Sequence, residues 1–195
     1  MKKLLTKQRM FIVILIAAIV GLISWQIINF NVENFDIVSK NPVSFGHNNI
    51  SSISSEYIIS EVQNSENKNP VLIYFYSTWC TACNKQFKDI NQIARNFQET
   101  NLKIFIIAID KDISSSKLSQ HLSKNGDIYF KPYYLVSKEG LRHFFFLKKI
   151  NYQGAIPFFM LFDKNGRVYW QSSGKTSYRS INNKLINVID FMNVK

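Results

Sequence analysis

The sequence predicts an α/β fold in which a mixed central sheet is flanked by helices and preceded by one N-terminal transmembrane helix. Two observations support this prediction. From residue 71 onward, short apolar runs of strand length alternate with amphipathic helical patterns. Nearer the start, residues 10–32 contain no charged residue, and a run of this length is sufficient for a helix that crosses a bilayer.

The first 49 residues are predicted to anchor the domain. We expect a basic cytoplasmic leader (1–9), a transmembrane anchor (10–32), a polar tether (33–49) and a folded domain (50–195). A cleaved signal peptide is the alternative. However, the apolar region of a signal peptide is shorter than this run and ends in a small-x-small cleavage site, which the residues after this run lack. Because positive charge precedes the span, the domain should face the periplasm or the outside of the cell, held by a single pass through the inner (cytoplasmic) membrane.

Composition narrows the possible functions. The formal net charge is +11, but no helix rich in Lys and Arg and no aromatic-basic stripe stands out, so no nucleic-acid partner is expected. The chain has only two cysteines, which excludes a framework of structural disulfides. The cysteine pair is therefore predicted to be a functional site.

That pair follows a predicted buried strand and opens a predicted helix. The apolar run 71–76 breaks at Ser77 and Thr78, and Cys80 and Cys83 follow with C-x-x-C spacing. The next apolar residues share one helical face: Phe87, Ile90, Ala94 and Phe97. The first sulfur should thus lie near a helix N-terminus, where free N–H groups and the macrodipole favour an anion such as a thiolate.

The other segments are predicted in chain order. Before the cysteine pair lies an ambiguous stretch with a short-helix pattern (50–69). After the helix that follows the pair come a buried and parallel strand (102–109), a helix stopped by Gly126 (114–125) and an unclear region (127–152) with a short-helix pattern over 141–150. The chain then continues with a strand (158–162), an Asn-Gly hairpin turn (163–166), its antiparallel return strand (168–170) and a closing amphipathic helix (181–192).

Two segments resemble the thioredoxin superfamily. One is Trp79-Cys80-Thr81-Ala82-Cys83 after its strand, and the other is residues 154–168, where a cis-proline opens a strand that ends in a tight turn. Together with the anchor and the insert over 127–152, the chain looks most like the membrane-tethered TlpA/ResA-type thiol–disulfide oxidoreductases. The resemblance implies a thioredoxin-like fold, a redox-active disulfide and no cofactor.

The resemblance also implies roles for individual residues. Cys80, nearest the helix start, is expected to attack substrates, and Cys83 to resolve the mixed disulfide. Trp79 should shield one side of the pair, and Trp79, Ile156 and a cis Pro157 should bind substrate. The implied partners are proteins with disulfides or thiols, cytochrome c apoprotein among them, and a membrane thiol–disulfide protein that donates electrons.

Two other functions remain open on the residues alone. Two thiolates and one histidine would suit a copper-binding assembly factor on the same fold, for which His143 is the only serious candidate. A redox-inactive binding module is the other. Two positions also depart from the family, since Tyr74 and Gln86 stand where relatives carry acids that help to move the proton of the inner thiol. The proton acceptor for Cys83 is therefore open.

Overall fold

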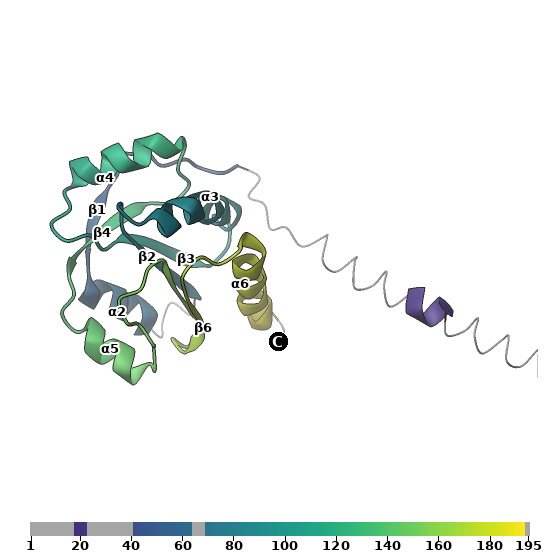
Figure 1. Ribbon diagram of the computed structural model, residues 1–195. Helices are drawn as coiled ribbons and strands as arrows, with labels where there is room; N and C mark the ends of the chain where they lie inside the picture. Colours follow the sequence, from purple (N-terminus) through teal and green to yellow (C-terminus); the bar gives the residue numbers. More distant parts are fainter. Residues whose placement is uncertain (1–17, 23–40, 64–68, 194–195) are drawn as a thin grey trace, which may run out of the picture. The chain divides into compact units, whose positions relative to one another are not determined.

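The computed structural model describes residues 18–22, 41–63 and 69–193 (Figure 1). Of the predicted anchor, only residues 18–22 are described, and they are helical. The leader, the rest of the anchor and the start of the tether lie outside the described residues. Within those that are described, no helix has both the length and the apolar character needed to cross a membrane.

The domain is built on a mixed sheet, as predicted, and its six strands have the order β1-β4-β3-β2-β5-β6. The strands are β1 (Ser51–Ser54), β2 (Val71–Tyr76), β3 (Lys103–Ala108), β4 (Pro132–Ser137), β5 (Phe158–Phe162) and β6 (Val168–Ser173). The first four in this spatial order are parallel to one another, whereas β5 is antiparallel to β2 and β6 to β5. The carboxyl ends of β2 and β3 therefore meet at one edge of the sheet.

Helices cover both faces of this sheet (Figure 1). They are α2 (Ser55–Gln63), α3 (Thr81–Asn96), α4 (Ser115–Leu122) with the 3₁₀ turn η1 (Ser123–Asn125), α5 (Leu141–Leu147) and α6 (Tyr178–Asn193). Side chains of α3, α4 and α6 pack with Leu72, Tyr74 and Tyr76. Side chains of α2 and α5 pack with the alternate residues of the same strand, Ile73 and Phe75. Strand β2 is thus buried on both faces, as its unbroken apolar run predicted.

The sequence prediction was incomplete at one side of the sheet. No strand was assigned in the unclear region, yet it contains β4, which lies between β1 and β3. Strand β1 precedes the predicted short helix, which is α2. Both strands lack a strong pattern: β1 buries only Ile53, and β4 buries only Pro132 and Leu135. The short helix α5 was predicted, and β6 is three residues longer than expected at its end.

The described end of the predicted tether, residues 41–49, packs against the domain. The backbone N–H of Val43 donates to Gln98 Oε1 at 2.7 Å, and Gln98 Nε2 donates back to the Val43 oxygen at 2.7 Å. Phe45 N–H donates to the Ile128 oxygen at 2.7 Å. These partners lie in the segments that lead into β3 and β4. The chain therefore enters the domain at the end opposite the carboxyl ends of the parallel strands.

Candidate active site

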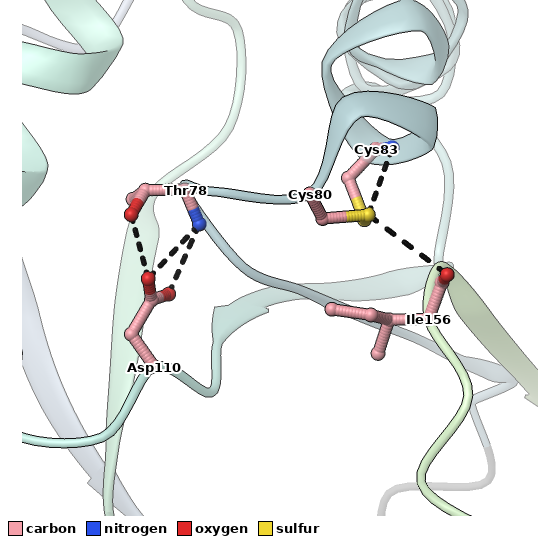
Figure 2. Close-up of a disulfide and its surroundings, with 5 residues drawn as sticks. All are labelled: Thr78, Cys80, Cys83, Asp110 and Ile156. Carbon is pink, nitrogen blue, oxygen red and sulfur yellow. Dashed lines mark hydrogen bonds between the residues drawn. A yellow bond between two sulfur atoms is a disulfide. The ribbon is translucent and has the colours of Figure 1, made fainter.

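The two cysteines lie where β2 passes into α3. Cys80 is the N-cap residue of α3, with extended backbone (φ −80°, ψ 107°), and it is joined to Cys83 by a disulfide with a Cα–Cα distance of 5.2 Å. Its sulfur accepts the backbone N–H of Cys83 at 3.1 Å (Figure 2). An N-cap side chain normally uses oxygen for this purpose. In the reduced protein the same N–H group favours a thiolate at Cys80.

Both sulfurs are well enclosed. Cys80 is 6% exposed and Cys83 is 2% exposed, so the first cysteine is the more accessible one. The difference in exposure is smaller than the position of Cys80 at the helix start suggested. The Cys80 sulfur lies 3.8 Å from the backbone oxygen of Ile156 (Figure 2). The backbone of Ile156 therefore lies directly beside the Cys80 sulfur.

The Ile156–Pro157 peptide bond is cis, as the sequence predicted. Pro157 is buried immediately before β5, and its backbone oxygen accepts the N–H of Gly174 at 2.8 Å, which extends the β5–β6 pairing by one residue at its open end. The side chain of Ile156 is half-buried between the two hydrophobic clusters. The structure thus brings the second predicted segment directly against the cysteine pair.

Trp79 projects into solvent beside the disulfide. Its side chain is 73% exposed, so it is not the side chain that encloses the two sulfurs. An exposed indole next to a reactive group offers a large, rigid contact surface at low entropic cost.

A polar contact that the sequence analysis did not identify fixes the loop before Cys80. Asp110 follows β3, and its two carboxylate oxygens each accept the backbone N–H of Thr78 at 3.1 Å. The Thr78 hydroxyl donates to Asp110 Oδ1 at 2.6 Å (Figure 2). The available signal was the adjacency of two parallel strands, with Thr78 and Asp110 each the second residue after its strand.

A thioredoxin-like family model matches residues 67–168, which include both the cysteine pair and the cis-proline strand. The chain belongs to the thioredoxin-like family. With the Cys80–Cys83 disulfide, it has the fold and the CxxC pair of the thiol–disulfide oxidoreductases in that family.

Solved structures agree with this fold. A thiol:disulfide interchange protein of the thioredoxin family from Chlorobium tepidum TLS is 18% identical with a TM-score of 0.53, over 65% of this chain and 84% of that chain. A candidate thiol:disulfide interchange protein DsbE from Chlorobium tepidum is 16% identical with a TM-score of 0.50, over 67% and 84%. No curated protein matches the sequence. At these identities the likeness shows the fold alone.

The two departures from relatives of the thioredoxin-like family both have structural explanations. Tyr74 is buried, its hydroxyl has no hydrogen-bond partner in the part of the chain that is described, and burial raises its pKa, so it stays protonated. Gln86 is fully buried and ties α3 to the loop before α6: its Oε1 accepts Thr176 N–H at 2.8 Å, and its Nε2 donates to Asp89 at 3.0 Å. Neither side chain is a base for Cys83.

The histidines lie apart from the cysteine pair in the sequence and do not gather into a metal site. His143 is exposed on α5, and His47 contacts the backbone oxygen of Gly126 at 2.7 Å through its Nε2. Among residues 18–22, 41–63 and 69–193, no group of three or more His, Cys, Asp or Glu side chains is close enough to hold a metal ion.

Proposed function

We propose that this protein is a membrane-anchored thiol–disulfide oxidoreductase that reduces or exchanges disulfides in extracytoplasmic proteins. One observation carries the proposal: the Cys80–Cys83 disulfide lies at the start of α3 with its Cys80 sulfur 3.8 Å from the backbone of Ile156. This arrangement joins a thiol activated by a helix N-terminus to a backbone segment that can hold a substrate.

The reaction begins with the reduced pair. The Cys80 thiolate attacks a substrate disulfide, the substrate S–S bond breaks, and the leaving sulfur takes up a proton. The Cys83 thiolate then attacks the Cys80 sulfur of the mixed disulfide, which releases the second substrate sulfur to be protonated. Two electrons pass to the substrate, the pair gives up two protons, and the Cys80–Cys83 disulfide of the structure is re-formed.

The cis-proline segment and Trp79 supply the substrate contacts. An extended substrate segment pairs with the backbone at Ile156, and the exposed indole of Trp79 packs on the other side of the substrate cysteine. Specificity in this arrangement comes from the few side chains around Cys80, because the pairing itself uses only backbone groups.

The pair works as a reductant that receives electrons from a membrane thiol–disulfide protein. The residues between the cysteines, Thr81 and Ala82, include no basic group that would over-stabilise the Cys80 thiolate, and a stabilised reduced form is what makes an oxidant. Equilibration of the protein with glutathione buffers tests this direction. A reduction potential below about −200 mV supports a reductant, and one near about −120 mV contradicts it.

The uncharged run 10–32 and the basic residues before it support the anchor and the outward topology. Cytochrome c apoprotein is the substrate that the family resemblance suggests. Protease treatment of cells whose outer envelope has been opened tests the topology. Digestion of the domain agrees with the proposal, whereas protection of the domain contradicts it.

A further inference from the structure

The loop between β2 and α3 is held by hydrogen bonds on either side of Trp79. Cys80 N–H donates to the Ser77 oxygen at 3.1 Å, which forms a turn around the intervening residues. Within that turn, the hydrogen bonds of Thr78 go to Asp110, from its N–H at 3.1 Å and from its hydroxyl at 2.6 Å (Figure 2). The position of Cys80 is thus coupled to a carboxylate on the neighbouring strand end.

We propose that Asp110 is a positioning residue that fixes the Cys80 loop through Thr78 and whose negative charge disfavours the Cys80 thiolate. In this role Asp110 opposes the helix N-terminus, which favours the thiolate. The balance between the two sets how much thiolate Cys80 forms.

Chain geometry places the carboxylate close enough to act on the sulfur. Thr78 and Cys80 are two residues apart, so their Cα atoms are separated by at most about 7 Å, and Asp110 is in direct contact with Thr78. The carboxylate is thus on the order of 10 Å from Cys80, a distance comparable with the screening length in 0.1 M salt. Because Cys80 is only 6% exposed, a like charge at this range is weakly screened and disfavours ionisation of the thiol.

The other titratable groups around Asp110 do not change charge where a thiol ionises. Burial raises the pKa of Tyr76 on β2, as do Tyr74 and Asp110, so its phenol stays neutral. Burial lowers the pKa of His121 on α4, with Asp110 opposing and Lys124 of η1 adding to this effect. His121 is therefore uncharged above its ordinary pKa of about 6.5, and the charged side chains of this group are Asp110 and Lys124.

The consequence for catalysis rests on the proposed function. A thiolate that is less favoured makes the reduced pair less stable, and the pair then passes its two electrons to a substrate disulfide more readily. Asp110 would thus help to make this pair a reductant without any acid beside Cys83. The ionisation of Cys80 is measured without a substrate, so its outcome is independent of whether the proposed reductase activity is found.

The test titrates a single thiol. In the full chain carrying Cys83→Ala, the ultraviolet absorbance of the Cys80 thiolate is followed against pH, with and without Asp110→Asn. The amide keeps the shape of Asp110 and an oxygen that accepts from Thr78, but it removes the charge. We expect about tenfold more thiolate at any pH below the midpoint, corresponding to the loss of a like charge in a poorly screened site.

Two matched variants separate charge from loop position. Asp110→Glu keeps the charge and should leave the thiolate fraction within about twofold of the unmodified site, and Thr78→Val keeps the carboxylate and should not raise the fraction. Thermal unfolding shows that each variant is folded, and Asp110→Ser replaces Asp110→Asn if the latter is not. An unchanged or smaller thiolate fraction in the folded uncharged variant overturns the proposal, as does an equal rise in Thr78→Val.

Discussion

The central strands and the strands at the β1 edge of the sheet are built differently. In β2 and β5 every residue is buried, and in β3 the last four are. In β1 a single residue is buried, and in β4 buried and exposed residues do not alternate regularly. The cysteine pair, the cis-proline and Asp110 all follow or begin one of the three central strands.

This difference shows what each region contributes. The central strands are hydrophobic on both faces, so their ends are fixed in space by the whole core, and the redox groups are attached to those ends. The β1–α2 and β4–α5 segments extend the sheet and cover one face of it, but they carry none of the residues around the disulfide. We therefore expect substitutions in the two regions to separate stability from activity.

The largest expected effect on stability comes from a matched pair of isoleucines. Ile73 in β2 has neighbours on both sides of its strand, whereas Ile53 in β1 pairs only with Leu135 of β4. Both are buried. We expect Ile73→Ala to lower the free energy of unfolding by about 4 kcal/mol and Ile53→Ala by about 2 kcal/mol, since the edge can collapse around the smaller side chain. Denaturant unfolding of the oxidised protein measures both, and equal losses would contradict the comparison.

The contrast also explains how much of the fold could be predicted from the sequence. Long apolar runs such as 71–76 and 158–162 predict buried strands without further information. Strands β1 and β4 could not be predicted, because neither has the apolar run or the regular alternation that is typical of a strand. Three of the four residues in β1 are serines, and β4 begins at Pro132. Their place in the sheet depends on tertiary pairing with each other and with β3.

Gly166 lies where the β5–β6 turn contacts α2, and its substitution should have the next largest effect on stability. It lies in the β5–β6 turn at φ +66°, and a Cβ atom there would overlap the backbone oxygen of Val62 in α2. Gly140, the N-cap of α5, also has a left-handed backbone at φ +76°, but the nearest atom to its Cβ position is Ile59 Cδ1 at an ordinary 3.6 Å. Gly166→Ala should cost about 3 kcal/mol and Gly140→Ala about 1 kcal/mol, since only the first adds steric overlap to backbone strain. Thermal unfolding compares them, and similar costs would mean that α2 yields at this contact.

Gln98 tests how firmly residues 41–49 are attached to the domain. Besides its two bonds to Val43, its Nε2 donates to the Tyr129 oxygen at 2.9 Å. Gln98→Ala should cost about 1 kcal/mol of global stability, because these groups are partly exposed to water. It should also speed amide exchange at Phe45 while the amides of β2 are unchanged. Unaltered exchange at Phe45 would show that the segment is held by its other contacts.

The smallest effect concerns pH. Burial lowers the pKa of His121 in the folded protein, so below its ordinary value of about 6.5 the unfolded chain binds more protons than the folded one. The stability that the neutral ring contributes is present above that pH and is lost as the pH falls through the lower folded-state value. His121→Gln should flatten this part of the stability curve. If the variant loses as much stability on acidification as the unmodified protein, other groups are responsible for that loss.

Much of the candidate site could be predicted as well, because Cys80, Cys83 and Pro157 lie in short segments whose spacing has meaning by itself. The contact between Thr78 and Asp110 could not, since it joins residues 32 positions apart whose types are common in loops. The high exposure of Trp79 also depends on the fold, because an aromatic residue beside a cysteine is compatible with either a covered or an open site.

The central claim is that Cys80 attacks substrates and Cys83 resolves the mixed disulfide, and trapping in cells tests it most directly. Cys83→Ala should accumulate disulfide-linked complexes with other proteins, because the attacking thiol remains and the resolving thiol is lost. Cys80→Ala is the matched control, which should form none and should lack activity. Complexes that disappear on reduction and depend on Cys80 would support the account. Complexes in the Cys80→Ala variant would reverse the two roles, and none in either variant would contradict thiol–disulfide exchange with proteins.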